Sequence, residues 1–88
     1  MPRYLVERTF EKGLPPGPEM AELCGAIVER NGDGCVTWLH SYVSEDRRKT
    51  FCIYEGPTPE AIRKAASRSD LPVDRITLIR VLDPYSYA

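Results

Sequence analysis

A β-hairpin is the feature of this sequence that most constrains the fold. The stretches Val36–Ser44 and Thr50–Glu55 are rich in β-branched and aromatic residues, and the five charged residues between them are too polar for a core. The hairpin holds the only histidine and the only tryptophan of the chain. We therefore expect a binding or active site to involve these two strands.

Side chains alternate between the two faces of a strand, so the hairpin is predicted to have two unlike faces. One face is aliphatic and is expected to lie under helices. It consists of Leu39, Val43, Phe51 and Ile53. The other face brings an imidazole, a thiol and aromatic rings within contact range. It consists of Trp38, His40, Tyr42, Cys52 and Tyr54.

The rest of the chain predicts two more strands and two helices. Arg3–Thr9 and Asp74–Asp83 have strand character, separated from their neighbours by a proline-rich loop over 12–18 and by Leu71-Pro72. Glu19–Arg30 has one apolar helical stripe, and a second helix is expected to begin after Thr58 and end near Ser69. The order predicts an α+β, ferredoxin-like βαββαβ sandwich: a four-stranded antiparallel sheet with both helices on one face and strands one and three central.

Length and charge narrow the possible functions. The 88 residues suffice for a single domain, 1–88, without a second core. With 12 basic and 13 acidic residues, the chain has no electrostatic support for binding nucleic acid or an anionic membrane. There is no apolar run of the roughly 20 residues that cross a bilayer, and no secretory signal, so we expect a cytoplasmic protein. The spacing of the three cysteines fits neither a disulfide scaffold nor a zinc finger.

The face of the sheet without helices is predicted to mediate self-association. Its three large aromatic residues would be exposed in a monomer, which is unfavourable and marks an interaction site. We therefore expect a homodimer whose two sheets face each other and enclose a cavity. Glu7, in the middle of the first strand, either points into solvent or lies on the same face as His40.

Metal binding is the first functional hypothesis. Imidazole, thiolate and carboxylate suit late first-row divalent ions such as Ni(II), Cu(II) and Zn(II), and His40, Cys52 and Glu7 provide one of each. Because the chain has one histidine, the remaining ligands must be water, a tyrosine oxygen such as that of Tyr54, or residues of a second subunit.

Two alternatives remain open. A cofactor-independent enzyme could use the dimer cavity with His40 as the base and Glu7 orienting it, since the pKa of histidine suits proton abstraction at cellular pH. A binding protein without turnover could hold a partner or a small molecule against amphipathic aromatic residues such as Trp38 and Tyr42.

Several blocks of the sequence resemble a bacterial family of small ferredoxin-like domains, of which one described member binds nickel. The blocks are YLVER (4–8), WLHSYVSED (38–46), TFCIYE (50–55), PEAIRKAA (59–66) and RVLDP (80–84), and the match extends from residue 3 to about 84. The resemblance implies a dimeric ferredoxin-like fold and permits a metal site, with nickel as the first candidate. The polar positions that match the family are Glu7, His40, Ser41, Tyr42, Cys52, Tyr54 and Glu55.

Overall fold

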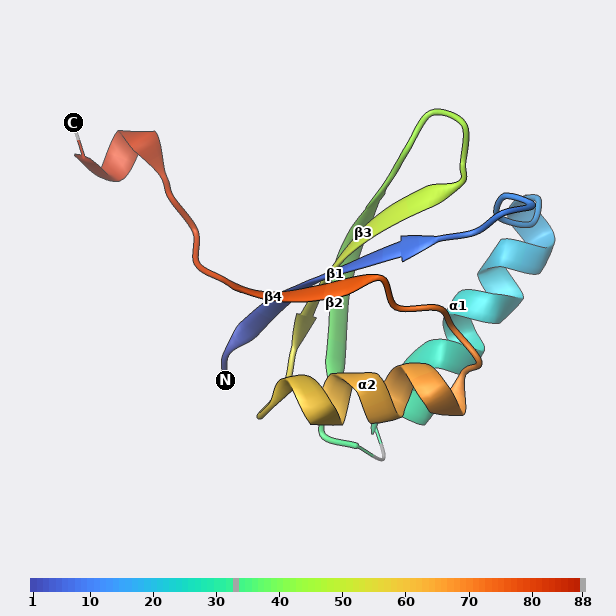
Figure 1. Cartoon of the computed structure of the whole chain (residues 1–88), viewed down its shortest axis with the longest axis horizontal. Coiled ribbons are helices and arrows are strands. Elements are labelled where there is room, and N and C mark those ends of the chain that lie inside the picture. Colours follow the sequence, from blue (N-terminus) through green and yellow to red (C-terminus); the bar gives the residue numbers. More distant parts are fainter. Residues whose placement is uncertain (33, 88) are drawn as a thin grey trace.

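Two helices lie against one face of a four-stranded antiparallel sheet in the computed structural model of the chain (Figure 1). The structure describes residues 1–32 and 34–87, the last of these by its backbone alone. In chain order the elements are β1 (Arg3–Thr9), α1 (Gly17–Gly32), β2 (Thr37–Val43), β3 (Lys49–Glu55), α2 (Pro59–Arg68), β4 (Arg75–Ile79) and a 3₁₀ helix, η1 (Pro84–Tyr87). This order confirms the predicted βαββαβ arrangement.

The lengths of α1 and β4 differ most from the prediction. The sequence predicts a loop over Lys12–Pro18, but α1 begins at Gly17. Pro18 is tolerated there because the first backbone N–H groups of a helix have no intrahelical acceptor. β4 is shorter than predicted and ends at Ile79, because Ile79 pairs with Arg3, the first residue of β1, and no partner strand continues beyond it.

The second helix, α2, forms where the sequence predicts it. Thr58 has an extended backbone, and its Oγ1 accepts a hydrogen bond from the backbone N–H of Ala61 at 3.1 Å. Ile62, Ala65 and Ala66 are buried against the sheet. The two alanines let the helix lie close to the strands.

The strands follow one another across the sheet in the order β2-β3-β1-β4, so that β1 and β3 are central. β3 pairs regularly with β1, but its pairing with β2 is interrupted. Trp38 lies opposite Tyr54, and His40 lies opposite Ile53. Two residues that are two positions apart on β2 thus pair with consecutive residues of β3. Leu39 is therefore the extra residue of a β-bulge.

The bulge changes which side chains of β2 share a face. Trp38 packs against the helix-covered core, while His40 and Tyr42 point to the opposite side, which we call the open face. The prediction that Trp38 shares a face with His40 is therefore wrong. The physical reason is that one additional residue reverses the alternation of every residue that follows it.

The face assignment of β3 is also the reverse of the prediction. Cys52 and Tyr54 are buried under the helices, at 4% and 3% exposure, whereas Phe51 and Ile53 lie on the open face. Both faces of this central strand carry large side chains, so its alternation is compatible with either orientation. The pairing of β3 with β1 determines the orientation of β3, because it places Cys52 beside the fully buried Val6.

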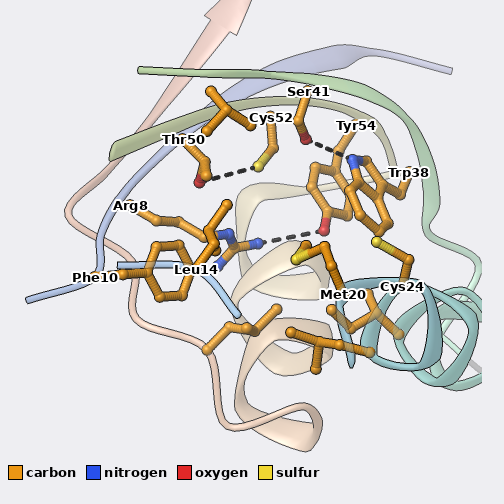
Figure 2. A pocket seen from close by; sticks show the side chains of 14 residues that line it. Arg8, Phe10, Leu14, Met20, Cys24, Trp38, Ser41, Thr50, Cys52 and Tyr54 are labelled. Carbon is orange, nitrogen blue, oxygen red and sulfur yellow. Dashed lines mark hydrogen bonds between the residues drawn. The ribbon is translucent and has the colours of Figure 1, made fainter. Parts of the chain in front are cut away.

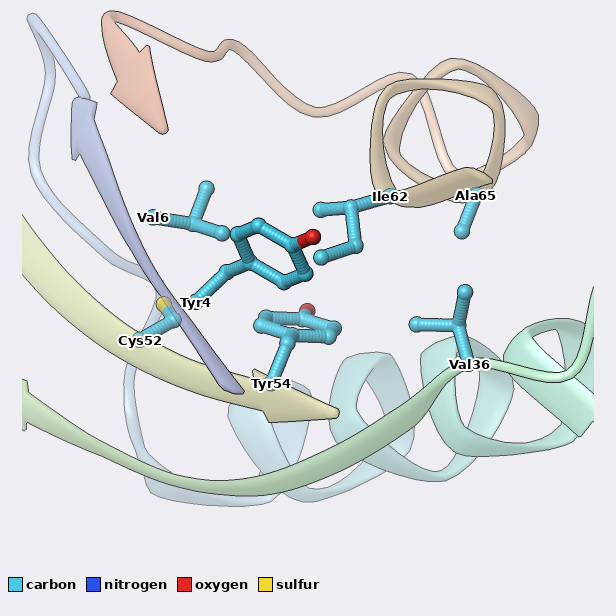
Figure 3. Close-up of a cluster of buried hydrophobic side chains, with 7 residues drawn as sticks. All are labelled: Tyr4, Val6, Val36, Cys52, Tyr54, Ile62 and Ala65. Carbon is cyan, nitrogen blue, oxygen red and sulfur yellow. The ribbon is translucent and has the colours of Figure 1, made fainter. Parts of the chain in front are cut away.

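The core lies between the sheet and α2 (Figure 3). Val6 and Ile62 are the largest side chains that are fully buried, and the ring of Tyr4 lies between them and Tyr54. The other members of the cluster are Val36, Cys52 and Ala65. No residue of α1 belongs to this cluster, and Ile27 is the only buried apolar residue of that helix.

The segment that follows β4 leaves the body of the domain (Figure 1). Val81, Leu82 and Tyr85 are 75%, 79% and 88% exposed, so these side chains do not pack against the domain within one chain. Neither helix of the part of the chain that the structure describes is long and apolar enough to cross a membrane.

Candidate functional site

The open face of the sheet carries two of the four predicted metal ligands. His40 on β2 lies in one row with Ile53, Leu5 and Thr77 of the other strands. The next row contains Tyr42, Phe51, Glu7 and Arg75. The open face thus has an apolar centre, formed by Leu5, Phe51 and Ile53, and carries His40 and Tyr42 on the edge strand β2.

His40 is accessible and has an aromatic neighbour. Its side chain is exposed, and its ring meets that of Tyr42 edge to face with the centroids 5.4 Å apart. Tyr42 is itself 63% exposed. A pocket of about 260 Å³ adjoins both residues and continues to Arg3, Ile79 and Arg80.

Glu7 shares the open face with His40 but is not its neighbour. Glu7 is on β1 and His40 is on β2, and β3 lies between these strands. The two strands are therefore about 10 Å apart, and the two residues are also in different rows. Over residues 1–32 and 34–87, no group of three or more His, Cys, Asp and Glu side chains could hold a metal ion. One chain therefore presents separate donors rather than a finished site.

Cys52 and Tyr54, the other two predicted ligands, lie on the far side of the sheet. The Cys52 thiol is within 3.5 Å of Thr50 Oγ1, and Tyr54 stacks with Trp38 at 6.3 Å between ring centroids. The Trp38 indole N–H donates to Ser41 Oγ at 2.7 Å, which fixes the two sides of the bulge relative to each other. The structure therefore does not bring Cys52, Tyr54 or Trp38 together with His40.

A cavity of about 220 Å³ lies on this helix-covered side, between α1 and the sheet (Figure 2). We call it the α1 cavity. Its wall is mainly apolar and aromatic and includes Phe10, Leu14, Met20, Leu23 and Trp38.

Arg8 of β1 also lines the α1 cavity, although its side chain is only 3% exposed. Its Nη1 donates to the carbonyl oxygen of Pro72 at 2.7 Å and its Nη2 to the hydroxyl of Tyr54 at 3.3 Å. The guanidinium carbon lies 5.7 Å from the centroid of the Tyr54 ring. Burial raises the pKa of Tyr54, and the positive charge of Arg8 opposes this shift.

Sequence reasoning did not single out Arg8. The available signal was its alternation with Tyr4 and Val6, which places all three side chains on one face of β1. An arginine at the end of a strand is usually exposed, so this pattern alone did not indicate a buried cation.

Comparison with known proteins identifies the family. The family model described as "Nickel responsive protein SCO4226-like" matches residues 4–79, which is most of the chain. The chain belongs to the SCO4226-like family. This confirms the resemblance to the family, whose description names a nickel-responsive protein.

The fold agrees with this membership. The crystal structure of SCO4226 from Streptomyces coelicolor A3(2) matches with a TM-score of 0.78 and covers 92% of this SCO4226-like chain and 99% of the other. Sequence identity is 15%, so this likeness concerns the fold alone. A comparison with curated proteins found no match.

Proposed function

We propose that this SCO4226-like protein binds a divalent transition metal, with nickel as the first candidate, at the open face of its sheet. The observation that carries the proposal is the position of His40: the only imidazole of the chain is exposed on the one sheet face that the helices leave uncovered. Imidazole is a preferred ligand of Ni(II), Cu(II) and Zn(II). The name of the family supports nickel among these ions.

The site is completed between two copies of the chain. Within one chain the donors of the open face are too few and too far apart, whereas a two-fold axis doubles every donor that lies near it. Two imidazoles of His40 and two carboxylates of Glu7 would then be available. The open face also offers an apolar surface, with Phe51, Ile53 and the largely exposed Tyr42, whose burial favours a homodimer.

Nickel titration of the wild type and of His40→Ala tests the metal site. We expect the wild type to bind nickel after purification without chelator, and His40→Ala to bind it more than about tenfold more weakly. Cys52→Ala is the matched control. Because Cys52 lies under the helices, it is expected to retain wild-type affinity. Metal content by elemental mass spectrometry gives the stoichiometry.

Light scattering on the same samples tests the dimer separately. Wild type and His40→Ala are both expected to be dimers, because the apolar centre of the open face is unchanged. Equal nickel affinity of these two proteins would contradict the role of His40. A monomer at micromolar concentration would contradict a site shared by two chains.

A further inference from the structure

Arg8 is a buried cation without an acidic partner in the described parts of the chain. The two acceptors of its guanidinium, the Pro72 carbonyl and the Tyr54 hydroxyl, are both neutral. Among residues 1–32 and 34–87, the only ion pair joins Arg3 to Glu55 on the opposite face of the sheet, at 3.1 Å. Charged side chains are rarely fully buried unless an opposite charge compensates them.

We propose that the α1 cavity binds a small monocarboxylate with a hydrocarbon body, and that Arg8 binds its carboxylate. A guanidinium presents five N–H donors in a planar fork that matches the two oxygens of a carboxylate. The bonds to Pro72 and Tyr54 occupy only part of this fork. The ligand would supply the negative charge that Arg8 lacks.

The wall of the α1 cavity defines the rest of the ligand. Around the single cation it is formed mainly by apolar and aromatic side chains such as Phe10, Leu14 and Trp38, which favour a hydrocarbon over a sugar or a polyphosphate. An apolar cavity of about 150 Å³ holds benzene. In proportion, the 220 Å³ of the α1 cavity suits a ligand of about nine non-hydrogen atoms, the size of benzoate.

The site is distinct from the proposed metal site, because the sheet separates the two. Arg8 and Tyr54 belong to the helix-covered face, whereas His40 and Glu7 belong to the open face. Failure of nickel binding would therefore leave this proposal intact, and the reverse also holds.

The test compares benzoate with benzyl alcohol, an uncharged probe of similar size, by NMR titration of the ¹⁵N-labelled full chain. For the wild type we expect saturable shifts of residues in the cavity wall with benzoate, and at least about tenfold weaker binding of benzyl alcohol. In Arg8→Met, which keeps an unbranched apolar side chain, the preference for benzoate is expected to disappear. A purely structural role of Arg8 would leave this preference unchanged.

A second pair of variants keeps the test valid if Arg8→Met does not fold. Cys24→Phe fills the α1 cavity while leaving Arg8 in place, and should abolish benzoate binding. Val28→Phe introduces the same side chain at an exposed position of the same helix and should leave binding unchanged.

Any one of the following results would overturn the proposal. They are equal affinity of the wild type for benzoate and benzyl alcohol, shifts confined to the open face, and an equal response to inorganic phosphate, which would indicate general anion binding. Absence of saturation at millimolar benzoate would also contradict it.

Discussion

The contribution of the hydrogen bond between Arg8 and Tyr54 to stability can be tested by replacing tyrosine with phenylalanine at either of two paired positions. Tyr54 and Tyr4 are direct partners across β3 and β1, and both are buried, at 3% and 6% exposure. The Tyr54 hydroxyl accepts a hydrogen bond from Arg8 Nη2. Among the described residues, the Tyr4 hydroxyl has no side-chain hydrogen bond of this kind. Tyr54→Phe and Tyr4→Phe therefore remove the same atom with different consequences.

The expected cost follows from the charge of the donor. Hydrogen bonds to charged groups contribute about 1.5–3 kcal/mol to stability. The 3.3 Å between Nη2 and the Tyr54 oxygen is longer than the usual range, so we expect the lower end, about 1.5 kcal/mol. In a domain of this size that corresponds to a decrease in Tm of about 6–12 °C. Tyr4→Phe should change the free energy of unfolding by less than about 0.5 kcal/mol.

Urea denaturation followed by far-ultraviolet circular dichroism measures both values. Fluorescence is less suitable, because the only tryptophan, Trp38, stacks on Tyr54 and would respond to the substitution itself. The m-value should be unchanged, which shows that the folded states remain comparable. An equal cost of the two substitutions, or no cost of Tyr54→Phe, would refute the argument that the hydroxyl compensates the buried guanidinium.

Two further predictions concern the same side of the sheet. Burial raises the pKa of Tyr54 above its usual value of about 10, so the stability that the protonated Tyr54 contributes is fully present below that pH and is lost as the pH rises through the folded-state pKa. In alkaline denaturation, the free energy of unfolding should therefore fall more steeply above about pH 10 for the wild type than for Tyr54→Phe. Parallel pH dependence of the two proteins would contradict this. In thiol labelling of the native protein, the exposed Cys35 should react first, the half-buried Cys24 more slowly, and Cys52, at 4% exposure, only on unfolding. Labelling of native Cys52 as fast as Cys35 would place it on the open face.

Local patterns in the sequence were sufficient to predict the helices and strands and their order along the chain. Thr58 followed by proline marks the start of α2 because a side-chain oxygen and a fixed φ suit a helix N-terminus, and the structure contains that hydrogen bond. The central position of β1 and β3 follows from right-handed crossovers, which depend on the order of elements and not on particular residues. Periodicity and capping involve residues a few positions apart, so the chain itself displays them.

The division of the predicted ligands between two faces could not be derived in this way. Alternation has a period of two, so a single extra residue, Leu39, places Trp38 and His40 on opposite sides. On β3, both Phe51 and Tyr54 are plausible core residues. The choice depends on the ladder with β1 and on the packing of α2, which are contacts between distant segments.

By itself, the sequence determined the α+β class, the βαββαβ order and the resemblance to the SCO4226-like family, because these depend on local periodicity and on the order of blocks along the chain. Only the tertiary structure decided that His40 and Glu7 lie on one face and Cys52 on the other, and that Arg8 is buried beside a cavity. The partners of Arg8 are 46 and 64 residues away along the chain. Whether a side chain meets water or a distant partner is decided by packing, which no local pattern of residues contains.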